Sequence, residues 1–250
     1  MALADGRVIT SPDNERVKDV VRLRKSRERR ASGLFIAEGR REVERALAAG
    51  LTARDAYVAP ELIAGWPHPH TEVSARVLAK MAYRAEPEGV IAVFEQPRRA
   101  LPGDATLILV AVGIEKPGNL GAMARTADAA GVDALIVADA QADPWNPNAI
   151  RASTGAVFTL PIVEATRADI EQLELQKVAA VTDATMRVDE ADLTQPTALL
   201  IGAEDKGLDE HWREIADVEA RIPMSGRSVD SLNASNAAAI LLYETLRQRG

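Results

Sequence analysis

Residues Thr106–Val112 form a run that is apolar at every position after the first. A strand without polar alternation is typical of a parallel sheet that is covered on both faces. Further strands are predicted at Ala134–Ala138, Val178–Thr182, Ala198–Gly202 and Glu219–Ile222, and helices at Asn119–Ala130 and Asn233–Arg249. This order predicts an α/β domain over residues 105–250 with a largely parallel sheet. In such domains ligands bind at the carboxyl ends of the strands.

The first 95 residues predict a second, smaller α/β domain. Strands are expected at Leu34–Ala37, Ala56–Ala59 and Gly89–Phe94, and helices at Arg40–Ala49 and Ala75–Met81. An earlier helix is predicted to begin at Ser11, which precedes Pro12, and to stop at Gly33. Residues 96–104 contain two prolines and one glycine, so they are the predicted linker between domains of residues 1–95 and 105–250.

The composition excludes several classes of protein. Hydrophobic residues make up 47% of the 250 residues, which is enough for a buried core and argues against disorder. Cysteine is absent and only three histidines occur, so disulfides are excluded and a metal site is not expected. No apolar run approaches the ~20 residues that span a bilayer, and the amino terminus lacks the apolar region of a signal peptide. We therefore predict a cytoplasmic protein with no metal and no membrane partner.

The charge is distributed unevenly along the chain. The formal net charge is −7, yet residues 16–54 contain 12 Lys or Arg and 5 Asp or Glu, a local excess of +7. One basic segment on an acidic chain is expected where a single region contacts a polyanion such as RNA. The predicted phosphate contacts are Arg22, Lys25, Arg29 and Arg30. A solvated basic helix face without a partner is the alternative that the charge run leaves open.

Polar residues follow the predicted strand at Thr106–Val112. In the loop and helix start at residues 115–126, Asn119 is placed to cap the helix, and free backbone N–H groups there favour an anion. Arg125 lies six residues further on and is expected to face the same cleft. A simple asparagine cap with an unrelated surface arginine is the alternative that these residues leave open.

Two later loops also place polar groups where strands end. Glu204 lies between Gly202 and Gly207, after the predicted strand at Ala198–Gly202. Ser231 and Asn233 precede a helix whose first turn is rich in small residues, and small side chains permit close approach of a flat ligand. Each loop alone is compatible with an ordinary strand–turn–helix connection. Three such loops in one domain indicate a functional site.

In this order and spacing, the three loops resemble the motifs of the SpoU (TrmH-like) RNA ribose 2′-O-methyltransferases of the SPOUT superfamily. The most specific part is Ser231-Leu232-Asn233 after Ile222-Pro223-Met224. The first domain resembles the L30e-like substrate-binding domain of that family, through Phe35, Glu38-Gly39 and residues 88–92. The two-domain layout is most similar to the ribosomal-RNA enzymes, including the thiostrepton-resistance type.

The resemblance implies a specific activity and a set of site residues. It implies a trefoil-knot catalytic domain, S-adenosyl-L-methionine as the cofactor, a homodimer, and methylation of a ribose 2′-hydroxyl, with 23S-type large-subunit rRNA as the expected substrate. The implied catalytic residues are Asn119, Arg125, Glu204, Ser231 and Asn233. The implied cofactor contacts are Thr182, Gly202, Ile222, Met224 and Leu232. Arg151 matches a second family arginine near the RNA.

Two alternative functions stay open at this point. A transfer-RNA 2′-O-methyltransferase is one, although such relatives usually lack the L30e-like domain. A non-catalytic RNA-binding factor of ribosome assembly is the other, although its motifs would be expected to have decayed. A dehydrogenase is excluded because no G-x-G-x-x-G follows the Thr106–Val112 strand. For Arg125, a role in holding phosphate and stabilising alkoxide is favoured over that of a base, because the guanidinium pKa exceeds about 12.

Overall fold

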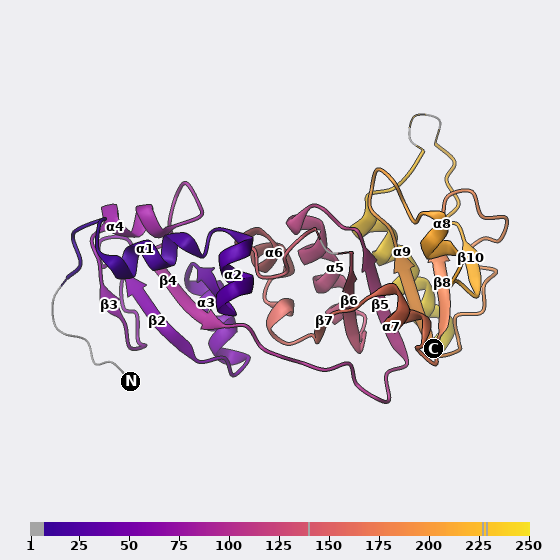
Figure 1. Ribbon diagram of the computed structural model, residues 1–250, viewed down its shortest axis with the longest axis horizontal. Helices are drawn as coiled ribbons and strands as arrows, with labels where there is room; N and C mark the ends of the chain where they lie inside the picture. Colours follow the sequence, from indigo (N-terminus) through magenta and orange to yellow (C-terminus); the bar gives the residue numbers. More distant parts are fainter. Residues whose placement is uncertain (1–7, 140, 227, 229) are drawn as a thin grey trace. The chain divides into compact units, whose positions relative to one another are not determined.

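The computed structural model describes residues 8–139, 141–226, 228 and 230–250 (Figure 1). The chain divides into two compact units. The first unit comprises the residues up to Arg98 together with Trp145–Phe158, and the second comprises Arg99–Pro144 and Thr159–Gly250. Residues 145–158 were predicted to belong to the second domain, but they pack with the first unit.

A four-stranded sheet forms the centre of the first unit, with strand order β1-β4-β2-β3. The β1–β4 and β2–β4 pairs are antiparallel and the β2–β3 pair is parallel. The strands are β1 (Leu34–Glu38), β2 (Ala53–Val58), β3 (Thr71–Glu72) and β4 (Val90–Glu95). The helices are α1 (Glu15–Arg22), α2 (Ser26–Ser32), α3 (Arg40–Ala48), α4 (Ala75–Met81) and α6 (Pro147–Ser153), followed by the 3-10 helix η1 (Ala156–Phe158).

The amino-terminal helix differs from its prediction. It begins after Asn14, whose side chain accepts a hydrogen bond from the N–H of Arg16 at 2.9 Å, so Ser11 is not its cap. It also ends at Arg22, and a separate helix α2 follows, closed by Gly33 in the left-handed conformation at φ 66°. The break between α1 and α2 lets Leu23 join the hydrophobic core that α1 and α4 form on the sheet.

The segment Trp145–Phe158 completes the core of the first unit through aromatic contacts. The ring of Phe35 lies 5.5 Å from that of Phe94, 4.9 Å from that of Trp145 and 5.8 Å from that of Phe158. Phe35, Phe94 and Phe158 are fully buried. Arg45 of α3 also donates a hydrogen bond to the carbonyl of Thr154. Residues far apart in the sequence therefore share one core.

The second unit is built on a six-stranded parallel sheet, as predicted, with strand order β10-β8-β9-β5-β6-β7. Its strands are β5 (Leu107–Val112), β6 (Ala134–Ala138), β7 (Ile162–Glu164), β8 (Gln176–Ala180), β9 (Thr197–Ile201) and β10 (Val218–Ala220). Its helices are α5 (Pro117–Ala129), α7 (Arg167–Glu171), α8 (Glu210–Arg213) and α9 (Ala234–Arg249). Five of these strands lie at the sites that the apolar runs predicted.

Apolar side chains cover both faces of this sheet. Ile108, Val110 and Val112 share a buried cluster with Ile170 of α7 and Trp212 of α8. Alternate residues of a strand point to opposite faces, so Leu107, Leu109 and Ala111 face the other side. Helices α5 and α9 contact each other, α5 also contacts β6, and α9 also contacts β9. Burial on both faces explains why the strands of this unit are uniformly apolar.

No helix in the described part of the chain is long and apolar enough to cross a membrane. No group of three or more histidine, aspartate or glutamate side chains among the same residues is arranged as metal ligands.

Candidate active site

The loops that the sequence singled out gather at one edge of the parallel sheet. Strands β5, β8, β9 and β10 run in the same direction, so their carboxyl ends lie at a common edge. The first loop follows β5, the second follows β9, and the third follows β10 and leads into α9. This edge is where a parallel α/β sheet ordinarily binds its ligand.

A cavity of about 340 Å³ opens at the ends of β8, β9 and β10. Its lining includes all five residues predicted to contact a cofactor, which are Thr182, Gly202, Ile222, Met224 and Leu232. Two of the predicted catalytic residues, Glu204 and Ser231, line it as well. The small residues Ala234 and Ala237 of α9 form another part of its wall, so the helix backbone can approach a ligand closely.

The second loop folds back on the end of β9, and glycine makes this possible. The N–H of Gly207 donates to the carbonyl of Ala203 at 2.8 Å, with Gly207 at φ 63°. A Cβ atom on Gly202 would lie 2.1 Å from the carbonyl carbon of Gly207. No side chain fits there unless the loop moves. The loop therefore brings backbone groups and the side chain of Glu204 to the cavity.

The first and third loops are joined by a hydrogen bond between two asparagines. Asn233 caps α9 by accepting from the N–H of Ser235 at 2.9 Å. Its Nδ2 atom donates to Oδ1 of Asn119 at 3.3 Å. Asn119 itself is not a helix cap, contrary to the prediction, because α5 begins two residues earlier at Pro117, with Lys116 at the capping position.

Two buried polar atoms at this sheet edge lack a hydrogen-bond partner among the described residues. They are Nδ2 of Asn119 and Oε1 of Glu204. Buried polar atoms in folded proteins nearly always have partners, so an unpaired donor and an unpaired acceptor indicate that a polar ligand completes the site.

Arg125 stands apart from the other predicted catalytic residues. It lies on α5, and its exposed side chain forms no hydrogen bond or ion pair with a described residue. Six residues of α-helix turn the chain through about 600°, so Arg125 and Asn119 leave the helix about 120° apart. The expectation that both face one cleft stays a prediction. An exposed, unpaired guanidinium is nevertheless available to an anionic substrate.

The predicted RNA contacts also separate into different groups. Arg22, Lys25 and Arg30 are exposed on α1, α2 and their junction. Arg29 is fully buried and donates to the carbonyl of Leu23 at 2.7 Å, so its predicted role as a phosphate contact is wrong. Arg151 is exposed on α6 of the first unit, where it donates to Oδ1 of Asn148 at 2.9 Å.

Several lining residues were missed by the sequence analysis. Asp205, Lys206 and Asp230 line the cavity beside predicted residues, and their position within the same loops was the only available indication. Arg213 was also missed, and it donates to both carboxylate oxygens of Glu219 at 2.7 Å and to Asp183 at 3.2 Å. The two hydrogen bonds from Arg213 to Glu219 hold the pKa of the Glu219 carboxyl below its usual value and tie α8 to β10, next to the cavity.

Comparison with known families gives a match for each unit. Residues 106–243 match the SpoU rRNA Methylase family, and residues 14–92 match an MRM3-like substrate binding domain. Among curated proteins, the 23S rRNA (guanosine(2553)-2′-O)-methyltransferase RlmP of Bacillus subtilis is 31% identical, over 94% of this chain and 97% of that protein.

Two solved structures are similar over nearly the whole chain. One is the crystal structure of an RNA 2′-O ribose methyltransferase, with a TM-score of 0.83 and 42% identity, covering 97% of this chain and 99% of that one. The other is the SpoU methyltransferase AviRb from Streptomyces viridochromogenes in complex with AdoMet, with a TM-score of 0.84 and 30% identity. That match covers 94% of this chain and 98% of AviRb.

Proposed function

This chain belongs to the SpoU rRNA methylase family, and on that premise we propose that it transfers the methyl group of S-adenosyl-L-methionine to a ribose 2′-hydroxyl of large-subunit ribosomal RNA. The observation that carries the proposal is the cavity at the ends of β8, β9 and β10. It is lined by the five residues that the sequence motifs predict as cofactor contacts. The activity is that of an RNA 2′-O-methyltransferase of the cytoplasm, where ribosomal RNA is found.

The residues around the cavity fit S-adenosyl-L-methionine. The methyl donor has an apolar adenine face, ribose hydroxyls, and a methionine part with ammonium and carboxylate groups. Ile222, Met224 and Leu232 offer apolar contacts, and the turn at Gly202 offers backbone hydrogen-bonding groups. The unpaired Oε1 of Glu204 is an acceptor for a hydroxyl or ammonium donor. Bound there, the donor supplies an electrophilic methyl group on a positively charged sulfur.

The remaining chemical task of the protein is to orient the ribose and promote loss of its hydroxyl proton. A hydroxyl is a poor nucleophile until its proton is removed or strongly polarised. Arginine is a poor base because its pKa exceeds about 12. We therefore assign Arg125 to hold the adjacent phosphate and to stabilise the developing alkoxide. We assign Ser231 of the cavity lining, together with the hydrogen-bonded pair Asn233 and Asn119, to position the ribose and the loops.

Ribosomal RNA is favoured over transfer RNA by the first unit. This unit matches a substrate-binding domain, and it carries the exposed basic residues of the chain's positive segment. A non-catalytic role in ribosome assembly would not require the polar side chains that line the cavity. The unpaired buried atoms of Asn119 and Glu204 support catalysis over that role.

The proposed function is tested by incubating the protein with large-subunit rRNA and S-adenosyl-L-methionine labelled on its methyl group. We expect label in the RNA at one nucleotide, and resistance of the following phosphodiester bond to alkaline cleavage, since that cleavage requires a free 2′-hydroxyl. The same assay with bulk transfer RNA should give no label. Label in transfer RNA alone would favour the tRNA enzyme, and no label in either would contradict the assignment.

Cofactor binding gives a prediction for thermal stability. S-adenosyl-L-methionine should bind without RNA and, at 100 times its Kd, stabilise the protein by about 2.7 kcal/mol. Ala237→Leu places extra methyl groups in the cavity wall and should abolish the shift, while Ala239→Leu, on the same helix but outside the lining, should retain it. Calorimetry and thermal melts measure both effects. Equal binding by the two variants would show that the donor lies elsewhere.

The basic segment gives a prediction for salt dependence. Replacing Arg22, Lys25 and Arg30 by alanine should weaken RNA binding and reduce its log–log salt slope by about 0.7–0.9 per lost phosphate contact. Arg76→Ala with Lys80→Ala is the matched control, since both residues are exposed on α4 of the same unit. Filter binding across a range of salt concentrations is the measurement. An unchanged slope would assign the segment to a solvated surface.

Two structural features belong to this proposal. The first is a trefoil knot in the second unit, supported by the common cavity that the loop after β9 and the segment between β10 and α9 line. The second is a homodimer, supported by Ile240 and Tyr243. These two residues lie three positions apart on α9 and are 41% and 55% exposed. Apolar side chains so exposed on one helix are typical of a surface that a second subunit covers.

A further inference from the structure

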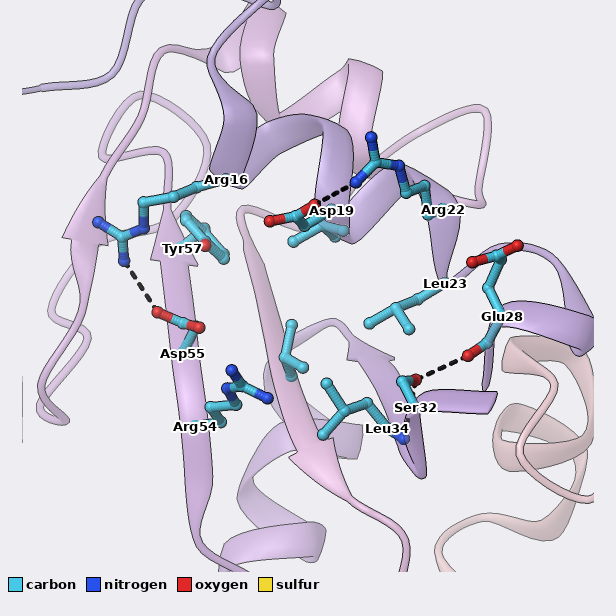
Figure 2. Close-up of a pocket in the computed structure, with 12 residues that line it drawn as sticks. Arg16, Asp19, Arg22, Leu23, Glu28, Ser32, Leu34, Arg54, Asp55 and Tyr57 are labelled. Atoms are coloured by element: carbon cyan, nitrogen blue, oxygen red, sulfur yellow. Dashed lines mark hydrogen bonds and ion pairs between the residues drawn. The ribbon is translucent and has the colours of Figure 1, made fainter. Parts of the chain in front are cut away.

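A second cavity, of about 300 Å³, lies in the first unit between α1 and α2 on one side and the sheet on the other (Figure 2). Its volume is at the lower end of the range of small-ligand sites. The floor is apolar and comes from Val20, Leu23, Leu34 and Val93. None of the residues that the motifs identify as catalytic or cofactor-binding lines it, so it is distinct from the methyl-transfer site.

Among the described residues, most charges around this cavity are paired, and one exposed arginine of the lining has no partner. Arg22 pairs with Asp19 at 2.7 Å, and Arg16 pairs with Asp55 at 2.9 Å while its guanidinium stacks 5.3 Å from the ring of Tyr57. Arg54 forms no hydrogen bond or ion pair with a described residue. Figure 2 shows its side chain extending from β2 into the cavity.

Glu28 is the complementary group on the lining. Its carboxylate forms no hydrogen bond or ion pair with a described residue, while its backbone N–H donates to the carbonyl of Lys25 and its backbone carbonyl accepts from the hydroxyl of Ser32 at 2.7 Å. The cavity thus combines an apolar floor, an unpaired cation and an unpaired hydrogen-bond acceptor. A nucleotide has the matching parts, which are a flat base, a phosphate and, on most bases, an exocyclic amine.

From this arrangement we propose that the cavity binds one unstacked nucleotide of single-stranded RNA. The base lies on Leu23 and Leu34, its phosphate contacts Arg54, and Glu28 accepts from its exocyclic amine. Proteins that recognise RNA by sequence commonly hold bases that are splayed out of the helix in this way. The proposal rests on the proposed function in one respect, since the RNA concerned is the methylation substrate.

Binding is measured on the full chain with a 20-nucleotide oligo(A) that contains one 2-aminopurine, whose fluorescence rises when the base unstacks. We expect the rise with the wild type and its loss with Arg54→Ala. Ser32→Trp, which fills the cavity from the end of α2, should weaken binding by about 5- to 150-fold, the range measured for single base contacts. Arg76→Ala and Ser11→Trp are the matched controls on the same unit and should behave as wild type.

A 20-base-pair RNA duplex serves as the second probe. Its bases are paired and stacked, so none can enter the cavity, and the cavity variants should bind the duplex as the wild type does. Equal loss of duplex and oligo(A) binding in Arg54→Ala would reduce the site to a charged surface and overturn the proposal. The proposal would also be overturned if the Ser32→Trp variant had the melting temperature of the wild type and still gave an unchanged fluorescence rise.

The same variants separate this proposal from the proposed function. With rRNA as substrate, Arg54→Ala should raise the KM for RNA, leave kcat at saturating RNA unchanged and keep the affinity for S-adenosyl-L-methionine. If the wild type methylates rRNA and both Arg54→Ala and Ser32→Trp keep the wild-type KM for RNA, the cavity proposal alone is overturned. A fluorescence rise that depends on Arg54, in a protein that methylates no rRNA, would instead contradict the proposed function alone.

Discussion

Replacement of Arg125 by alanine is expected to slow methyl transfer to rRNA by about 10²–10³-fold, the usual loss when one group that stabilises a developing oxyanion is removed. The side chain is exposed and forms no hydrogen bond or ion pair with any described residue, so its removal leaves no buried group unpaired. Thermal stability and the affinity for S-adenosyl-L-methionine should therefore stay at wild-type values. Single-turnover transfer of labelled methyl groups measures the rate.

The lysine variant and a control sharpen this test. Arg125→Lys should be nearly as slow as the alanine variant, because an ammonium group cannot reproduce the planar guanidinium fork. Arg247→Ala removes another exposed arginine of the second unit and should keep the wild-type rate. Wild-type turnover in Arg125→Ala would move the role to Arg151 or Glu204. Loss of cofactor binding would make Arg125 a structural residue.

The second large effect is expected in the first unit, from a residue distant in sequence. Phe158→Ala should lower the free energy of unfolding of that unit by about 3–5 kcal/mol, because it removes a fully buried ring from the cluster around Phe35 and leaves a cavity. Leu62→Ala, at a side chain that is 46% exposed, should change it by less than about 0.5 kcal/mol.

Hydrogen exchange locates the Phe158 effect. Amides of β4, which carries Phe94, should exchange faster in Phe158→Ala, and amides of β9 in the second unit should not. If the alanine variant is insoluble, Phe158→Leu should show the same pattern with a smaller loss. Faster exchange in β9 with protection kept in β4 would contradict the assignment of Phe158 to the first unit.

Local patterns were sufficient for the strands and for the sheet edge at which the three loops meet. An apolar run such as Leu107–Val112 indicates burial on both faces, and parallel strands bring their carboxyl ends to one edge. The family resemblance, and not the local pattern, named Gly202 and Leu232 as cofactor contacts, and both line one cavity although 29 residues lie between them. The family resemblance supplied the choice among the polar residues of the loops.

Long-range packing and the burial of charge could not be predicted in this way. Phe35 contacts Phe158, which lies far away in the sequence, and the hydrophobic periodicity of a single helix or strand does not predict such a contact. Arg29 was counted with its exposed neighbours because a charge count does not record that a carbonyl, here that of Leu23, accepts its hydrogen bond inside the core. The Asn14 cap was missed because Ser11 before Pro12 fits the same capping pattern.

The division of the first unit into two stretches of chain has a consequence for inheritance. The backbone passes from one unit to the other three times, after Arg98, Pro144 and Phe158. A gene fusion that exchanged only the first 98 residues between two relatives would bring in a Phe35 side chain without the Trp145 and Phe158 rings that pack against it in its own chain. An exchange that keeps the core of this unit intact therefore has to transfer two separate blocks of sequence together.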